Sequence, residues 1–164
     1  MDTTKKPAKE KLSDAMAIGK PDMEVKKGKY TLTIIKPFAV KNGYVGPILA
    51  HINQACFRIV AMKYVQLTID QARAFYEIHK DKAFYNKLCR FMSSGPIVVA
   101  ILEKDDAVNS FRQLIGSTNP NEANVGTIRK LFGSNVQANA VHGSDSDENA
   151  EKEADFFFSK LERF

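Results

Sequence analysis

Apolar residues recur along most of the chain at two spacings, one typical of strands and the other typical of helices. Four stretches are rich in β-branched and aromatic residues: residues 30–35, 57–67, 97–102 and 139–142. Such stretches, bounded by polar or glycine-containing segments, predict four strands. The second stretch is the longest, and we expect it to form a buried, central strand.

Helices are predicted between these strands from apolar positions that lie three and four residues apart. They are expected after Gly43, after the N-cap residue Thr68, over residues 84–92, from Asp105 or Asp106, and over residues 147–158. The long segment between residues 116 and 137 holds only one short helical piece, near residues 127–132. Long irregular loops are uncommon in compact domains and are often functional.

The order of these elements predicts the fold class. A chain in which strands alternate with helices builds a layered α/β sandwich. Four strands in this order suit a ferredoxin-like α+β arrangement, with a four-stranded antiparallel sheet covered by helices and a long loop inserted before the last strand. We expect this domain to span residues 30–164.

The basic character of the chain is concentrated at its N-terminus. The 164 residues carry a formal net charge of +5, and residues 1–29 alone hold eight lysines and five acidic residues. The remainder is close to neutral, so a nucleic-acid-binding face is not indicated. Pro7 and Pro21 interrupt the N-terminal segment. We therefore expect residues 1–29 to be a flexible extension with at most a short helix near residues 10–18.

The sequence lacks the marks of membrane and secreted proteins. No apolar run reaches the roughly 18–20 residues that cross a bilayer, and the polar N-terminus lacks the apolar core of a signal peptide. Cys56 and Cys89 stand alone within apolar segments, and we expect both to be reduced, buried thiols. These features predict a cytoplasmic protein with no membrane partner.

The three histidines differ in their surroundings. His51 lies on the polar side of its predicted helix, and His79 lies at a helix end, where a cationic side chain suits the helix dipole. His142 ends the last strand and is followed at once by Gly-Ser-Asp and an acidic helix start. Ligand-binding groups gather at such strand ends in α/β proteins. This pattern alone does not separate a catalytic histidine from a structural one.

Several common chemistries lack their sequence signatures. The chain has no His-x-x-x-His or Cys/His cluster for zinc, no Gly-x-Ser-x-Gly elbow, and no glycine-rich phosphate loop of the Walker or dinucleotide type. Phosphate would therefore have to be held by side chains. Lys36, Arg112 and Arg129 could together supply the cationic clamp that a transferring phosphoryl group needs.

Six short motifs stand in a fixed order between residues 29 and 158. They are Ile34-Ile35-Lys36-Pro37, Val45-Gly46, Ser94-Gly95-Pro96, Gly116-Ser117-Thr118-Asn119-Pro120, Gly126-Thr127-Ile128-Arg129 and Asn139-Ala140-Val141-His142-Gly143-Ser144-Asp145-Ser146. In order and spacing they resemble the nucleoside diphosphate kinase family. The combination of the last motif with the two before it is highly specific.

The resemblance implies a ping-pong reaction on His142. The γ-phosphate of a nucleoside triphosphate would pass to this histidine and then to a nucleoside diphosphate. A neutral imidazole nitrogen suits the role because it is nucleophilic near pH 7 without a strong base. Glu153 resembles the family's carboxylate that orients the imidazole, and Ser144 resembles the hydroxyl that completes this network.

The resemblance also implies a set of nucleotide-binding side chains. Those that match the family's phosphate-holding groups are Lys36, Tyr76, Arg112, Thr118 and Arg129. Asn139 matches the amide that binds the sugar hydroxyl together with Lys36. Phe84 matches the aromatic ring on which the base stacks, and Val136 matches the opposite wall. Stacking accepts every base, so a broad range of ribo- and deoxyribonucleotides is expected.

The cofactor and partners implied by the family are Mg²⁺, nucleotides and further copies of the chain. Mg²⁺ would bridge the nucleotide phosphates and keep its waters, so we expect no dedicated protein ligands for it. The expected nucleotides are tri- and diphosphates such as ATP and GTP, and the expected assembly is a homo-hexamer or tetramer. The apolar C-terminal segment, residues 156–164, is expected to pack against the domain or a neighbouring subunit.

Two places depart from the family pattern. Phe38-Ala39 stands where the family usually has Asp-Gly, and Asn42 stands in place of a basic residue. We expect apolar packing to replace a polar contact there and to shift Lys36 slightly. Lys82-Ala83 replaces the family's frequent Arg-Pro, and we expect this change to loosen the helices that clamp the nucleotide.

Two other functions remain open at this point. One is a nucleotide- or nucleic-acid-binding regulator that keeps the fold without the chemistry. The other is a histidine phosphotransferase with a non-nucleotide acceptor. The presence of Lys36, Arg129 and His142 disfavours the first, and Phe84, Asn139 and the long loop disfavour the second.

Overall fold

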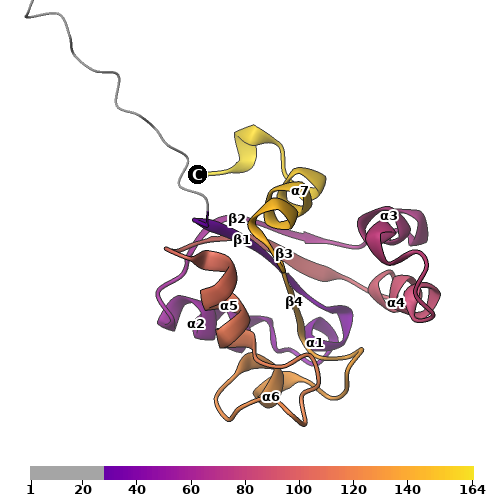
Figure 1. Cartoon of the computed structure of the whole chain (residues 1–164), viewed down its shortest axis with the longest axis horizontal. Coiled ribbons are helices and arrows are strands. Elements are labelled where there is room, and N and C mark those ends of the chain that lie inside the picture. Colours follow the sequence, from indigo (N-terminus) through magenta and orange to yellow (C-terminus); the bar gives the residue numbers. More distant parts are fainter. Residues whose placement is uncertain (1–27) are drawn as a thin grey trace, which may run out of the picture.

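A four-stranded antiparallel sheet forms the centre of the computed structural model, which describes residues 28–164 (Figure 1). Its strands are β1 (Tyr30–Ile35), β2 (Arg58–Val65), β3 (Ile97–Glu103) and β4 (Val141–Gly143). They lie in the order β2-β3-β1-β4, and every neighbouring pair is antiparallel. This order is the ferredoxin-like arrangement that the sequence predicts.

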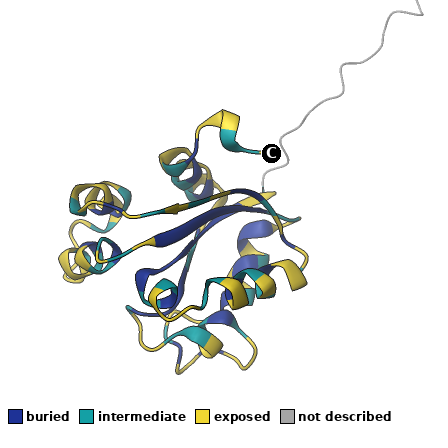
Figure 2. Ribbon diagram, turned by 180° about the vertical axis from the view of Figure 1, so that it is seen from behind, coloured by how far each residue is buried: buried dark blue, intermediate teal, exposed yellow. Residues whose placement is uncertain are grey.

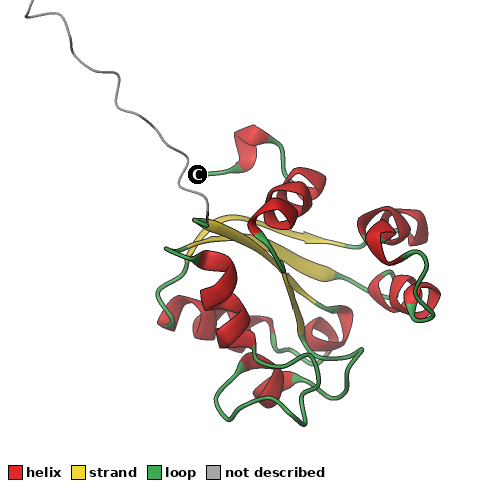
Figure 3. Ribbon diagram, viewed as in Figure 1, coloured by secondary structure: helices red, strands yellow, loops and turns green. Residues whose placement is uncertain are grey.

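Helices cover both faces of this sheet (Figure 3). One face carries α3 (Ile69–Phe75), α4 (Tyr85–Met92) and α7 (Asp147–Phe157). The other face carries α1 (Pro37–Lys41), α2 (Val45–Gln54), α5 (Ala107–Ile115) and α6 (Ile128–Phe132). Two short 3₁₀ helices, η1 (Glu77–His79) and η2 (Lys160–Glu162), complete the described elements.

The core lies on both sides of the two central strands, which are buried almost from end to end (Figure 2). Leu32 and Ile34 of β1 face α3, α4 and α7, whereas Ile35 faces α1, α2 and α5. Because residues of a strand alternate between its faces, one strand contributes to both apolar clusters. Strand β1 is thereby held firmly, and β4, which carries His142, pairs with it.

Strand β2 is not the buried central strand that we expected. It lies at the edge of the sheet, and its side chains Met62 and Tyr64 are 53% and 64% exposed. A long apolar run gives the composition of a strand but not its place in the sheet, which is set by distant pairing partners. The length of the run was therefore a misleading guide to burial.

Helix α1 was missed by the prediction because Pro37 looked like the end of the preceding strand. In the structure Pro37 is instead the first residue of the helix. Proline suits that position, since its fixed φ matches the helix and its missing N–H needs no partner there. Ala39 is fully buried in the apolar cluster on this face, in line with the apolar packing expected at Phe38-Ala39.

Cys56 is not the buried thiol that we expected. It is exposed and adopts a φ of 63° in the turn between α2 and β2, whereas Cys89 is buried, and both thiols are free. A left-handed backbone costs a residue with a side chain about 1–2 kcal/mol, because Cβ approaches the following carbonyl. The apolar neighbours of Cys56 in sequence concealed a turn position that glycine would occupy without strain.

The first described residues contact the end of β3 and the start of α5. Gly28 accepts a hydrogen bond from the backbone N–H of Ala107, and Lys29 forms an ion pair with Glu103. The expected extension, residues 1–29, including its possible helix near residues 10–18, lies outside the described residues except for Gly28 and Lys29. Within residues 28–164, no helix combines the length and apolar character that crossing a bilayer requires.

The C-terminal segment packs against the domain only in part. Phe158 is buried, and the backbone N–H of Phe164 donates to the carbonyl of Val60 on β2. The side chains of Leu161 and Phe164 are nevertheless exposed. The backbone of this segment is therefore tied to the edge strand while much of its apolar surface stays open.

Candidate functional site

A cavity of about 980 Å³ lies beside the end of β4, between α3, α4, α7 and the long loop before β4. The predicted site residues that line it are Lys36, Tyr76, Phe84, Arg112, Thr118, Arg129, Val136, Asn139, His142 and Glu153. Ser144, the remaining predicted residue, is fully buried behind Glu153. The fold thus brings together side chains that are widely separated in the sequence.

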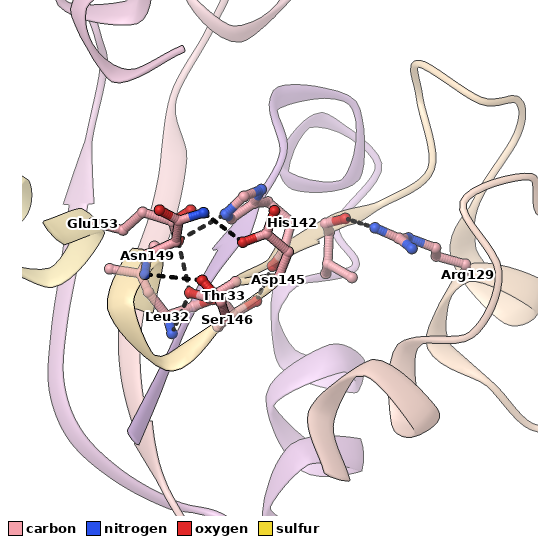
Figure 4. Close-up of polar contacts among 10 residues, drawn as sticks. Leu32, Thr33, Arg129, His142, Asp145, Ser146, Asn149 and Glu153 are labelled. Carbon is pink, nitrogen blue, oxygen red and sulfur yellow. Dashed lines mark hydrogen bonds and ion pairs between the residues drawn. The ribbon is translucent and has the colours of Figure 1, made fainter. Parts of the chain in front are cut away.

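His142 is held by a carboxylate and a hydroxyl (Figure 4). Its Nε2 atom lies 3.0 Å from Oε2 of Glu153, and the hydroxyl of Ser144 donates to the same oxygen at 2.6 Å. An ionised carboxylate can only accept hydrogen bonds, so Nε2 carries the proton in this arrangement. The other ring nitrogen, Nδ1, then keeps its lone pair for a nucleophilic role.

Strand β1 fixes the backbone around this histidine. Ile34 lies opposite His142 in the β1–β4 pairing, and the hydroxyl of Thr33 donates to the carbonyl of His142 at 2.9 Å. The backbone N–H of Leu32 donates to the hydroxyl of Ser144 at 3.1 Å. The orienting network is therefore anchored in a buried central strand and not in a loop.

The starting residue of helix α7 determines the position of Glu153 relative to His142. Ser146 is its N-cap, and the Ser146 hydroxyl accepts a hydrogen bond from the backbone N–H of Asn149 at 3.1 Å. Such a cap satisfies one of the free N–H groups of the first turn and fixes where the helix starts. Glu153 then lies two turns along the helix, on the side that faces β4.

Two aromatic rings of α3 and its C-cap flank the imidazole. Phe75 and Tyr76 approach His142 edge-on, with ring centroids 5.7 Å and 6.3 Å away. Burial, and then the nearby charge of Glu153, raise the pKa of Tyr76, whose hydroxyl has no partner among the described residues. Tyr76 therefore enters the site as a neutral hydroxyl with a proton to donate.

The cavity also contains a cluster of cationic side chains near the end of β4. Lys36 is only 7% exposed, and its burial, followed by the charge of Arg129, lowers its pKa to about 7. Burial and the neighbouring Arg112 lower the pKa of Arg129 to about 10. Within residues 28–164, none of these three side chains forms an ion pair with a carboxylate. This part of the cavity is suited to an anion.

The long loop is tied to the strand that carries the histidine. Arg129 donates to the carbonyls of Gly116 and Val141 at 3.0 and 3.1 Å, and Asn139 donates to the carbonyl of Thr118 at 3.1 Å. Figure 4 shows Arg129 at the right, with a dashed line from its guanidinium. These bonds connect the beginning of the loop with its end and with β4. The polar groups of the loop are therefore held at defined positions although the loop is irregular.

An apolar clamp stands at the mouth of the cavity. Phe84 and Val136 both line it although they are 52% and 56% exposed. The hydroxyl of Tyr85 donates to the carbonyl of Arg73 at 3.0 Å and so links α4 to α3. This link constrains the two helices that Ala83 was expected to loosen. Exposed apolar side chains that line a cavity are suited to a flat aromatic ligand.

Comparison with known proteins identifies the family. A model of the family "Nucleoside diphosphate kinase" matches residues 29–163. The chain belongs to the nucleoside diphosphate kinase family. The nucleoside diphosphate kinase of Flavobacterium psychrophilum is 55% identical over 134 residues, which cover 82% of this chain and 96% of that protein. That of Persephonella marina is 52% identical over 132 residues, covering 80% and 94%.

Solved structures of nucleoside diphosphate kinases share the fold. The Aquifex aeolicus enzyme has a TM-score of 0.82 and 42% identity, with 83% of this chain and 99% of that chain covered. The Halobacterium salinarum enzyme, solved in complex with CDP, has a TM-score of 0.80 and 32% identity, with coverages of 84% and 91%. The chain is thus a nucleoside diphosphate kinase, which decides between the functions that the sequence pattern left open.

Several side chains that line the kinase's cavity had no role in the sequence prediction. Asp145 accepts a hydrogen bond from Asn149 at 2.6 Å, and this bond is the main cause of its lowered pKa. Its place three residues after His142 was the available signal. Lys87 and Gln137 also line the cavity, and no sequence pattern distinguishes them from ordinary surface residues.

The metal ligands of this kinase were expected to come from the nucleotide and not from the protein. Among residues 28–164, no group of three or more His, Cys, Asp or Glu side chains is arranged to hold a metal ion. Asp145 and Glu153 do line the cavity, but Glu153 already accepts from His142 and Ser144. This donor set fits a Mg²⁺ ion that arrives with its nucleotide and keeps most of its waters.

Proposed function

We propose that the nucleoside diphosphate kinase activity of this chain proceeds through a phosphohistidine on His142. The observation that carries the proposal is the contact between His142 Nε2 and Glu153, which assigns the proton of the neutral imidazole to Nε2 and so makes Nδ1 the nucleophilic nitrogen, in a cavity lined by Lys36, Arg112 and Arg129. A nucleophile that needs no deprotonation, facing an anion-binding surface, is suited to phosphoryl transfer.

Each half-reaction forms one bond to phosphorus and breaks another. Nδ1 of His142 attacks the γ-phosphorus, and the bond between that phosphorus and the β–γ bridging oxygen breaks. The electron pair leaves with the nucleoside diphosphate. The imidazole gains positive charge during this attack, and the carboxylate of Glu153, held by Ser144, stabilises it. A second diphosphate reverses the same steps, so the two half-reactions use one site.

The other cavity residues bind the phosphates, the sugar and the base of the nucleotide. Lys36, Tyr76, Arg112, Thr118 and Arg129 hold the phosphates beside His142. Asn139, whose Oδ1 atom is buried without a partner among the described residues, binds the sugar hydroxyl together with Lys36. Phe84 and Val136 enclose the base. The CDP complex of the Halobacterium salinarum relative supports a nucleotide as the occupant.

Mg²⁺ is the proposed cofactor. When bound, it neutralises phosphate charge and so makes the γ-phosphorus easier to attack. Asp145 would hold it, by accepting hydrogen bonds from its waters, because this carboxylate faces the cavity and its pKa lies below the usual range. The cationic side chains then complete the neutralisation of the phosphates.

Labelling with γ-labelled ATP and Mg²⁺ tests the proposal. The protein should acquire an acid-labile, alkali-stable label that a nucleoside diphosphate removes completely. Peptide mapping should place the label on His142 and on neither His51 nor His79. A chelator should prevent the labelling. Direct transfer between nucleotides without a labelled protein would refute the phosphohistidine, and label that a nucleoside diphosphate does not remove would refute the second half-reaction.

We also propose that the kinase acts in the cytoplasm as a homo-oligomer built on the domain from residue 30 to residue 164. The exposed Met62 and Tyr64 on the edge strand β2 support the assembly, because exposed apolar side chains on an edge strand favour pairing with another chain. Sedimentation equilibrium should give four or six times the chain mass of 18.3 kDa. A monomer at micromolar concentration would contradict this.

A further inference from the structure

Lys87 is a cationic side chain at the base end of the cavity for which the proposed mechanism has no use. It lies three residues after Phe84, so both side chains project from the same side of the start of α4, and both line the cavity. Within residues 28–164 its ammonium group takes part in no ion pair. The ammonium group also forms no hydrogen bond with another described residue.

A second hollow, of about 470 Å³, lies on the other side of Lys87. Lys87 and Gln137 line both this hollow and the main cavity, and Arg90 and Ser94 line the second hollow alone. Lys87 and Gln137 therefore stand between the two spaces, at the outer rim of the clamp that Phe84 and Val136 form. A base held in this clamp would direct its outer edge toward them.

The chemistry of that outer edge differs among the bases. The exocyclic group at purine C6 or pyrimidine C4 lies opposite the glycosidic bond, so it points outward when the sugar is held deep in the cavity. It is a carbonyl oxygen in guanine, uracil and thymine, and an amino group in adenine and cytosine. An ammonium group donates hydrogen bonds and cannot accept them.

We propose that Lys87 makes this kinase discriminate between keto and amino bases, in favour of guanine and uracil nucleotides. The proposal rests on the placement of the base between Phe84 and Val136. Lys87 donates to the carbonyl oxygen of a keto base, whereas it meets the amino group of adenine or cytosine as a second donor. Gln137 presents both an acceptor and a donor and so does not oppose either kind of base.

The expected discrimination is modest because Lys87 is exposed to solvent. A hydrogen bond from a charged donor at an exposed rim gives roughly a threefold to tenfold preference. Purines extend farther from the sugar than pyrimidines, so the ratio of GDP to ADP should exceed the ratio of UDP to CDP. Arginine at position 87 should keep the preference, because it is also a cationic donor.

The test measures the second half-reaction from isolated, labelled phosphoenzyme by rapid quench with GDP, ADP, UDP and CDP. Wild-type second-order rate constants should favour GDP over ADP by about threefold to tenfold. In Lys87→Met both keto-to-amino ratios should fall to about one, and in Lys87→Arg they should persist. Arg90→Met removes the same charge one turn farther along α4, outside the cavity, and should leave the ratios unchanged.

Each of the other possible outcomes would refute a different part of the two proposals. Equal rate constants for all four diphosphates in the wild type would overturn the proposal while leaving the phosphohistidine mechanism intact. An equal loss for all four in Lys87→Met would show that Lys87 attracts phosphate and does not sense the base. Phe84→Ala should slow all four reactions, and if it slowed none, the placement of the base in the proposed function would be wrong.

Discussion

Replacing His142 with alanine should lower the rate of phosphoryl transfer from ATP to GDP by on the order of 10⁴-fold or more. The variant loses the only atom that the proposed mechanism uses as a nucleophile. Direct transfer between two nucleotides cannot replace it, because the cavity has one cationic cluster and one base clamp. The measurement is the initial rate of GTP formation, together with the loss of label from the protein.

The fold should tolerate this change. His142 is bonded through its backbone to Thr33 and through pairing to β1, and alanine keeps both contacts. Ser144 still donates to Glu153. We therefore expect unfolding free energies within about 1 kcal/mol of the wild type. His51→Gln is the matched control, since the ring of His51 bonds to the carbonyl of Gly126 and lies edge-on to the ring of Phe132, and His51 does not line the cavity. A purified His142→Ala variant that kept a tenth of the activity would refute the mechanism.

The sequence was sufficient for the order of the strands and of the α-helices other than α1, and insufficient for the positions of the strands in the sheet. The capping box of Thr68 and Gln71 and the N-cap of α7 are local, and both helices begin where the sequence predicts. The edge position of β2 depends instead on which strands pair, and β3 lies beside both β1 and β2 through long connections. Local patterns contain no information about that choice.

The site shows the same division between local and distant information. His142 and Asp145 belong to one short motif, which pointed to His142 directly but gave no role to Asp145. The carboxylate of Glu153 could be assigned only by resemblance, because its contact depends on how α7 packs against β4. Lys87 carries no pattern at all. It becomes a candidate only when the cavity places it beside Phe84.

Replacing Lys36 with methionine should reduce phosphoryl transfer by about 10²–10³-fold and at the same time stabilise the fold. Methionine has a similar length, and it removes an ammonium group that is only 7% exposed and without a hydrogen-bonding partner among the described residues. Burying such a charge is costly, and the lowered pKa of about 7 expresses that cost. At pH 6 the variant should unfold with a free energy about 2–4 kcal/mol larger than the wild type.

The sign of the pH dependence distinguishes this cause from ordinary repacking. The pKa of Lys36 is about 7 in the folded chain against 10.5 for an ordinary lysine, so between these values the unfolded chain holds the extra proton. Wild-type stability therefore rises with pH across this window, and the full penalty applies below pH 7. The advantage of Lys36→Met should shrink by about 2 kcal/mol between pH 7 and pH 9. Urea unfolding at both pH values measures it, with Lys41→Met on the exposed side of α1 as the control.

Activity should follow the opposite trend in the same pH window. Above pH 7, Lys36 is increasingly neutral when no nucleotide is bound. It must then take up a proton as the nucleotide phosphates bind, before it can act as a cation beside Arg112 and Arg129. The KM of the wild type should therefore rise from pH 7 to pH 9, and that of Lys36→Met should stay flat. If the variant were less stable than the wild type at pH 6, or if its advantage were the same at both pH values, burial of a charged Lys36 would not be the origin of the effect. Lys36 thus destabilises the nucleotide-free protein and regains its proton when the nucleotide binds. Its presence serves nucleotide binding and not stability.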